Sequence, residues 1–212
     1  MKKLILLTLL IPMLVHAKPS VEKNASFQPV FNQMVFFQVP KGFNLAPDWE
    51  QTASGQYIQE RVLNGENVNT WTQMITLTGH QNLANNPQLS PVDFLNFFAQ
   101  KFHDSCPTSF SALALNEEKV AGIETASAVI GCGTLGNTSE TALIVIVKGK
   151  QDYYTLQWAE HTKASKTPLS IDKSLWLKRL KNINPIRLCQ IPANASDSMV
   201  DCIGDLKSDF GM

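Results

Sequence analysis

The stretch TALIVIV, from Thr141 to Val147, decides the fold class of this chain. Successive side chains of a β-strand point to opposite faces, and here both faces carry apolar residues. A strand that is apolar on both faces needs cover above and below it, which a central place in a layered sheet provides. The stretch therefore predicts the central strand of a sheet with other elements packed on it.

Further strands are expected on both sides of this stretch, because short apolar or alternating runs are separated by Gly, Asn and Pro turn signals. The clearest pair lies before it, where two runs are joined by a turn that starts at Asn64 and Gly65, and we expect them to be antiparallel. In the second run, Trp71, Ile75 and Leu77 should share one face, and the intervening threonines the other. The expected strands span residues 35–39, 56–63, 71–78, 110–115, 123–132 and 153–159, with a turn at 116–119.

Two helices are expected. The first starts at Ser90, a good N-cap, followed by Pro91 at the first helical position and Asp93 where a capping-box acid belongs. It should run to about His103 and bury a stripe of Phe94, Leu95, Phe98 and Phe102. The second starts near Ser170 and ends between residues 182 and 185, with a stripe of Ile171, Leu175, Trp176 and Leu180.

The order of elements predicts an α+β domain in which an antiparallel sheet carries two helices. Residues 35–185 are expected to form this single domain. Residues 18–34 show little periodicity and are interpreted as an N-terminal arm. Residues 186–212 are interpreted as a C-terminal tail that a disulfide holds in place.

The first 17 residues are interpreted as a cleaved secretory signal peptide. Lys2 and Lys3 precede an apolar run of about a dozen residues from Leu4 to Val15, and Ala17 occupies the −1 position of a cleavage site. The first cysteine is Cys106, so the chain is not expected to be a lipoprotein. Later segments lack the length of apolar sequence that a membrane span needs. The expected location is the periplasm or the secreted fraction.

The chain has 4 cysteines, and an even number in an exported protein favours disulfides over metal or thiol chemistry. Four cysteines allow three pairings. We favour Cys106–Cys132 and Cys189–Cys202, because the members of each pair are close in sequence. The alternative is a nucleophilic Cys106 with His103 or His161 as its base. No CxxC spacing is present, so neither a thioredoxin-like site nor a zinc knuckle is supported.

Composition excludes some classes of function. Lys plus Arg equals Asp plus Glu, at 18 each, so the chain has no bulk attraction for phosphate backbones and is not expected to bind nucleic acid. Hydrophobic residues make up 44% and charged residues 17%, which suits a folded core.

Some segments resemble a known family. Val39-Pro40-Lys41-Gly42-Phe43 resembles the opening of Mog1/PsbP-like α/β/α sandwich domains, and the segments 71–76 and 153–157 are similar to segments of small exported bacterial proteins of unassigned function. The resemblance covers about residues 35–184. It implies the sandwich fold and an accessory or binding role, and it supplies no catalytic residues.

The chain lacks the nucleophile elbow, the Walker A and Rossmann glycine patterns, and HExxH, so no catalytic, cofactor-binding or metal-binding residue is predicted. Glu160-His161 is the nearest approach to a site, although a solvated strand end explains it as well. Lys173, Lys178, Arg179 and Lys181 give the second helix a basic face. That face could touch an anionic partner or simply be solvated.

Trp49 is the best candidate for recognition, because an exposed loop tryptophan can anchor a protein partner. The alternative is that its ring folds back onto the sheet. We expect the contact surface to include Trp49 in the loop region 43–55, together with Asn64 and Gly65 in the next turn. Two hypotheses follow. The first is a non-enzymatic exported protein that binds a protein partner. The second is a small secreted hydrolase with scattered active-site residues that include His161.

Overall fold

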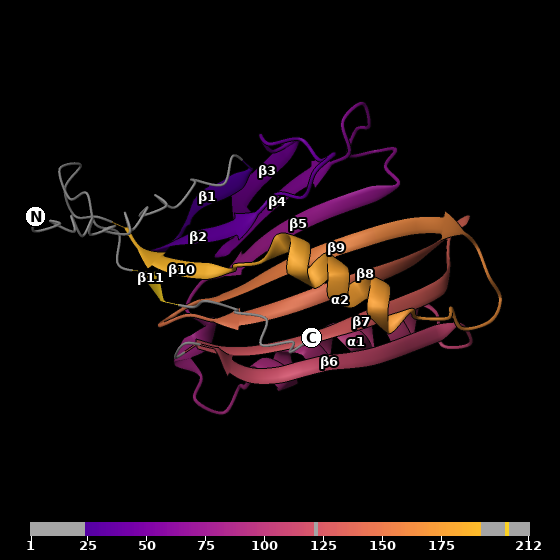
Figure 1. Ribbon diagram of the computed structural model, residues 1–212. Helices are drawn as coiled ribbons and strands as arrows, with labels where there is room; N and C mark the ends of the chain where they lie inside the picture. The colour runs from indigo at the N-terminus through magenta and orange to yellow at the C-terminus, as the bar shows by residue number, and fades with distance from the viewer. Residues whose placement is uncertain (1–23, 121–122, 192–201, 204–212) are drawn as a thin grey trace, which may run out of the picture.

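The computed structural model describes residues 24–120, 123–191 and 202–203, so the predicted signal peptide at residues 1–17 lies outside the described residues. The described part contains a seven-stranded and a four-stranded antiparallel sheet with two α-helices (Figure 1). Its strands are β1 (Ala25–Val30), β2 (Gln33–Gln38), β3 (Trp49–Ala53), β4 (Gln56–Val62), β5 (Gln73–His80), β6 (Phe110–Val120), β7 (Ile123–Leu135), β8 (Thr138–Lys148), β9 (Tyr153–Lys163), β10 (Arg187–Gln190) and β11 (Cys202–Ile203). Its helices are α1 (Pro91–Ser105), α2 (Lys173–Ile183) and a short 3-10 turn at Leu83–Asn85.

The large sheet has the strand order β3-β4-β5-β9-β8-β7-β6, and each neighbouring pair of strands is antiparallel. Strand β8 contains the stretch 141–147 and pairs on both sides, with β9 and with β7. Its residues 142–147 are all buried. The predicted central strand is therefore confirmed.

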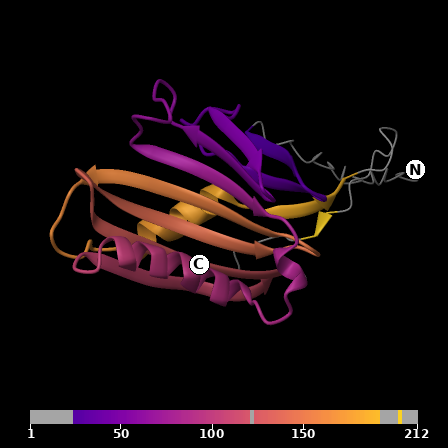
Figure 2. The same cartoon turned by 180° about the vertical axis from the view of Figure 1, so that it is seen from behind.

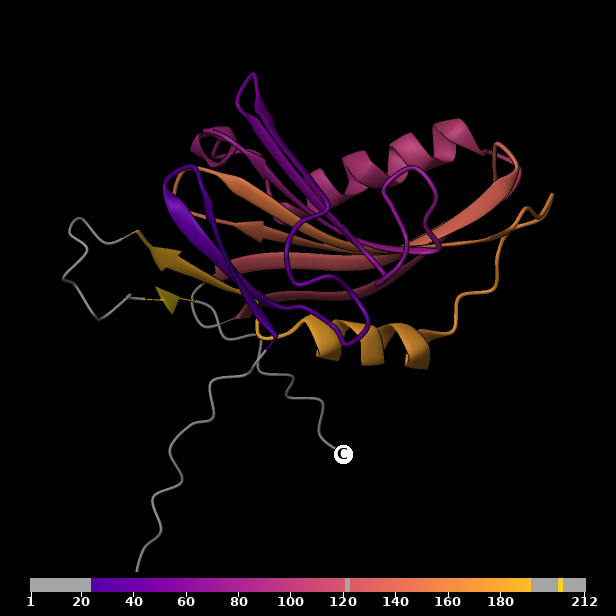
Figure 3. The ribbon, with the colours of Figure 1, turned by 90° about the horizontal axis from the view of Figure 1, so that it is seen from above.

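The large sheet is covered on both faces. Helix α1 packs on one face over β6, β7 and β8, as Figure 2 shows, and Figure 3 shows α2 on the opposite side of the sheet. The small sheet β1-β2-β10-β11 contributes to the same core as α2, because Phe37 and Leu188 are buried with Trp176 and Leu180. A second core lies under α1 and includes Phe94 and Leu95. The α+β prediction, with two helices on antiparallel sheets, is confirmed.

Helix α1 begins as its sequence predicts. The Ser90 hydroxyl accepts a hydrogen bond from the Asp93 amide at 3.1 Å, and the Asp93 carboxylate accepts one from the Ser90 amide at 3.0 Å. Pro91 occupies the first helical position. These contacts satisfy backbone donors that the first turn of any helix leaves without a partner. The buried stripe holds Phe94 and Leu95, as expected.

The expected arm and tail differ from the structure. Residues 25–30 form β1 within the expected arm, and β1 pairs with β2, which begins at Gln33 and contains most of the strand expected at 35–39. Residues 187–190 form β10, which also pairs with β2. Both segments are strands of the small sheet. A four-residue strand is too short to show a period, and Pro29 within β1 weakens the sequence signal for a strand. Most of the tail, residues 192–201 and 204–212, lies outside the described residues.

Three local expectations are wrong. Residues 116–119 belong to β6 rather than a turn, and the register of β6 against β7 shifts between Ala114 and Asn116. Trp71 precedes β5 and does not share a strand face with Ile75 and Leu77. Leu175 is 42% exposed, while Trp176, Leu180 and Ile183 form the buried side of α2. The first two expectations misplace where β6 ends and where β5 begins, and the third misplaces the buried side of α2.

Both predicted disulfides are present. Cys106, at the C-cap of α1, is bonded to Cys132 on β7, and Cys189 on β10 is bonded to Cys202 on β11. Disulfides form and persist in oxidising compartments, so their presence indicates maturation outside a reducing cytosol. No helix in the described ranges has the length and apolarity needed to cross a membrane.

Candidate functional site

Trp49 begins an edge strand, whereas the sequence placed it in a loop. Strand β3 lies at one end of the strand order of the large sheet (Figure 1). Its five residues are all exposed. Trp49 is 39% exposed, so part of its surface remains open to solvent. The β3-β4 hairpin is thus an edge ribbon with an aromatic ring available to solvent.

The face that carries Trp49 is the face on which α1 packs. One row of paired residues runs across the sheet from Trp49 to Glu60, Thr76, Gln157 and Ile144. Directly paired residues project to the same side, and Ile144 belongs to the core under α1. Because α1 packs on β6, β7 and β8, it lies over the other half of the sheet (Figure 3). We call Trp49, Gln51 and Ala53 the ribbon face.

The opposite face of the ribbon is anchored by hydrogen bonds. Glu50 accepts hydrogen bonds from the Tyr57 hydroxyl at 3.2 Å and from the Gln59 amide at 3.4 Å. Burial, with the nearby Glu50 carboxylate, raises the pKa of Tyr57, so its hydroxyl keeps its proton and remains a donor. This network fixes β3 on β4 while leaving the ribbon face open.

Arg61 holds the loop that leads into the ribbon. Its guanidinium, in a residue only 2% exposed, donates to the Leu45 carbonyl at 3.2 Å and to the Ser26 hydroxyl at 2.9 Å, and it also donates to Gln59. It lies 5.3 Å from the centre of the Phe37 ring. Burial lowers the pKa of Arg61. The local sequence does not distinguish Arg61 from a solvated arginine, because its partners Leu45 and Ser26 come from other segments of the chain.

The turn predicted to adjoin Trp49 is also exposed. Asn64 and Gly65 are both exposed, and Gly65 has a φ of 90°, a left-handed conformation that glycine adopts without strain. The backbone N–H of Asn64 donates a hydrogen bond to the Gly42 carbonyl at 2.8 Å. Trp49 pairs with Glu60 on β4, and the turn begins at Asn64, four residues after Glu60. The ribbon and the turn are therefore successive exposed parts of one edge.

His161 contacts Glu140 rather than the adjacent Glu160. Its Nε2 lies 3.2 Å from Glu140 Oε2, and the indole of Trp71 stacks on its ring with centroids 3.6 Å apart. Burial raises the pKa of Glu140, and the hydrogen bond from His161 opposes that shift. Glu160 instead forms an ion pair with Arg179. No serine, threonine or cysteine side chain of the described segments is hydrogen-bonded to the His161 ring.

The other histidines lie apart from this pair. His80 packs edge-on against Phe94, and its Nε2 is buried without a hydrogen-bond partner. Burial lowers the pKa of His80. His103 lies 3.8 Å from Asp104 at the end of α1. Over the described stretches of the chain, no group of three or more His, Cys, Asp or Glu side chains could hold a metal ion.

The predicted basic face of α2 is only partly free. Arg179 lies over the Trp176 ring at 4.2 Å and pairs with Glu160, so it belongs to the packing of α2 on the sheet. Lys173, Lys178 and Lys181 are exposed.

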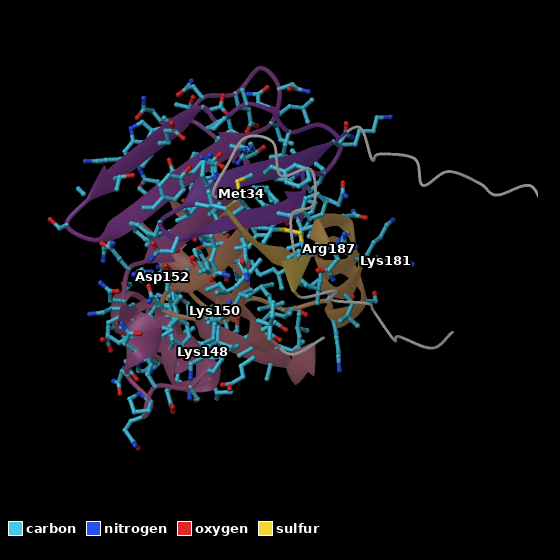
Figure 4. All side chains as sticks on the ribbon, turned by 90° about the vertical axis from the view of Figure 1, so that its left-hand side faces the viewer. Met34, Lys148, Lys150, Asp152, Lys181 and Arg187 are labelled. Atoms are coloured by element: carbon cyan, nitrogen blue, oxygen red, sulfur yellow. A yellow bond between two sulfur atoms is a disulfide. The ribbon has the colours of Figure 1, made fainter. Side chains whose placement is uncertain are left out.

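Two shallow polar hollows lie at the end of the molecule that Figure 4 faces, where Lys150, Asp152 and Lys181 are labelled. The first, of about 380 Å³, is lined by Asn32, Gln33, Lys150, Gln151, Asp152, Gln190 and Ile191. Asp152 in this hollow is fully buried, and its carboxylate accepts hydrogen bonds from the backbone N–H of Asn82 at 2.8 Å and from the Tyr154 hydroxyl at 3.2 Å. Asp152 therefore anchors a turn. The second, of about 470 Å³, has Lys41 and Lys181 on its walls.

A scan against models of known protein families and a search of curated proteins found no match to this chain.

Proposed function

We propose that this chain is an exported, non-enzymatic protein that binds a protein partner in the cell envelope or outside the cell. The predicted signal peptide at residues 1–17 would direct it there. The two disulfides support the same location, because they require an oxidising compartment. The proposal includes kinship with Mog1/PsbP-like domains, and the helices on both faces of the sheet support that kinship.

The observation that carries the proposal is the exposed ribbon. All five residues of β3 are exposed, and one of them is a tryptophan on an open sheet face. Tryptophan is enriched among the residues that contribute most to the affinity of protein interfaces. The Glu50 network and Arg61 hold the ribbon in place before a partner arrives, which reduces the ordering cost of binding.

The enzymatic alternative has one observation in its favour, the contact between His161 and Glu140. A carboxylate that orients a histidine is part of many hydrolytic sites. Here the ring is covered on one face by Trp71, and the described residues supply no hydroxyl or thiol partner to it. The His161–Glu140 contact joins β9 to β8. The Trp71 stack and the hydrogen bond from the His161 backbone N–H to the Thr72 carbonyl, at 2.9 Å, hold the segment before β5 against β9.

Site-specific photocrosslinking tests the binding proposal in the natural host. A benzophenone amino acid is placed at Gln51 on the ribbon face and, as a control, at Phe97, which is 57% exposed on α1. We expect, at Gln51 and not at Phe97, a discrete crosslinked protein that mass spectrometry identifies as different from this chain. Equal crosslinking at both positions, or at neither, would contradict a partner at the ribbon. Turnover of an ester, peptide or glycoside that is abolished by His161→Ala would favour the enzymatic alternative.

A further inference from the structure

The β3-β4 turn sets the direction of the backbone groups along β3. Ser54 and Gly55 have φ values of 51° and 75°, and they join the paired residues Ala53 and Gln56. In a hairpin with a two-residue turn of this kind, the two residues that flank the turn form a hydrogen-bonded pair. The Gly55 carbonyl accepts a hydrogen bond from the Gln81 backbone N–H at 2.9 Å, so it points toward β5, the other neighbour of β4, and away from β3. Gln56 therefore faces β3.

Hydrogen bonding alternates along an antiparallel pair, so the backbone of Gln51 faces β4, as that of Ala53 does. The N–H and C=O groups of Glu50 and Thr52 then point away from β4. No described strand pairs with this outer edge, because β3 is the last strand in the order. A short row of outward donors and acceptors is thus available for another strand.

We propose that this edge pairs with the same edge of a second copy of the chain, in antiparallel orientation about Gln51. In that register, Glu50 of each copy lies opposite Thr52 of the other, and these are the residues whose backbone groups point outward. Each such pair exchanges two backbone hydrogen bonds. The two large sheets would then join into one continuous sheet across a two-fold axis, the commonest symmetry of homo-oligomers.

The side chains of β3 favour a second copy as the occupant of this edge. Each Trp49 lies opposite Ala53 of the other copy, a small residue that leaves space for the indole. Gln51 faces Gln51, and Glu50 faces Thr52, so no like charges stand opposite each other. The strand can therefore pair with itself without directly opposed like charges, and with a large residue opposite a small one. The ribbon faces of both copies would also form one surface, so the dimer leaves Trp49 available to the partner proposed above.

Five residues make a small interface, below the roughly 1,200 Å² of a stable one, so the dimer should be weak and reversible. A covalent trap is the appropriate test. Gln51 faces its counterpart as a non-hydrogen-bonded pair, for which the Cα atoms lie about 4.5 Å apart, within the range that a disulfide spans. In the purified full chain, Gln51→Cys should form a disulfide-linked dimer with oxidised glutathione at least about tenfold faster than Phe97→Cys.

A mixed experiment checks the register. Glu50→Cys and Thr52→Cys should each dimerise slowly alone, since neither residue faces itself, but a mixture of the two variants should quickly form a heterodimer with one disulfide between the introduced cysteines. This pair of variants also keeps the test valid if Gln51→Cys fails to fold. Equal rates for all variants and for Phe97→Cys would overturn the proposal. The purified chain is tested alone, so this failure would leave the partner proposal standing.

Discussion

At the scale of single residues, the three tyrosines are the most informative reporters of the fold. Tyr153 donates to the Leu89 carbonyl at 2.6 Å, and Tyr154 donates to Asp152 at 3.2 Å. Burial, with the charges of Glu124 and Asp93, raises the pKa of Tyr153 to about 12. Burial and Asp152 raise the pKa of Tyr154, and burial and Glu50 raise the pKa of Tyr57. Each hydroxyl therefore keeps its proton well above the usual range.

Tyrosine ionisation, followed by ultraviolet absorbance, should be delayed in the folded chain. In urea, the tyrosines should titrate near pH 10, their ordinary pKa. Above pH 10 the unfolded chain releases protons that the folded chain retains, so the free energy of unfolding should fall as the pH rises toward 12. A tyrosine that ionised near pH 10 while circular dichroism remained native would contradict the burial of these groups.

Contacts between residues far apart in the chain are what the sequence could not predict at this scale. The sequence pointed to Glu160 beside His161, but neighbours along a strand project to opposite faces, so His161 meets Glu140 across the sheet. Arg61 was missed for a similar reason, because its partners Ser26 and Leu45 come from other segments. The disulfide pairs could be predicted, since each joins cysteines near in sequence.

At the scale of elements, α1 shows how much local sequence can establish. Its capping residues and apolar spacing predicted its start and its buried side, and both are confirmed. Phe94 packs edge-on against His80, Phe98 and Tyr153, whereas Phe97 on the same helix is 57% exposed. The two aromatic residues therefore test the orientation of the helix.

Phe94→Ala should lower the free energy of unfolding by about 3–5 kcal/mol, the range for truncating a buried phenylalanine. Phe97→Ala is the matched control and should change it by less than about 0.5 kcal/mol, as at an ordinary surface position. Urea unfolding followed by circular dichroism measures both values. Similar losses for the two variants would mean that α1 does not present Phe94 to the sheet.

The small sheet marks the limit of prediction from local pattern. Strand β10 has four residues, and its partner β2 lies about 150 residues earlier in the chain, so its pairing is decided by long-range packing. Leu188 on β10 pairs with Val35 on β2, and its side chain is buried in the core beneath the small sheet.

At the scale of the whole molecule, the two faces of the large sheet are covered unequally. The small sheet and α2 contribute to the core on one face, while α1 packs on the other over β6, β7 and β8 (Figure 3). The ribbon face carries Trp49 on the half of the sheet away from α1. The sequence predicted Trp49 as the contact residue, but its place on an edge strand became apparent only from the order of the strands.

The most direct test of the central claim is the affinity of the Trp49→Ala variant for the partner that crosslinks at the ribbon. Isothermal titration calorimetry should show a loss of at least about 2 kcal/mol, or roughly 30-fold, as for a tryptophan at the centre of an interface. Phe97→Ala, the control, should bind as the unchanged chain does. An unchanged affinity for Trp49→Ala would contradict the account and place the contact elsewhere on the molecule.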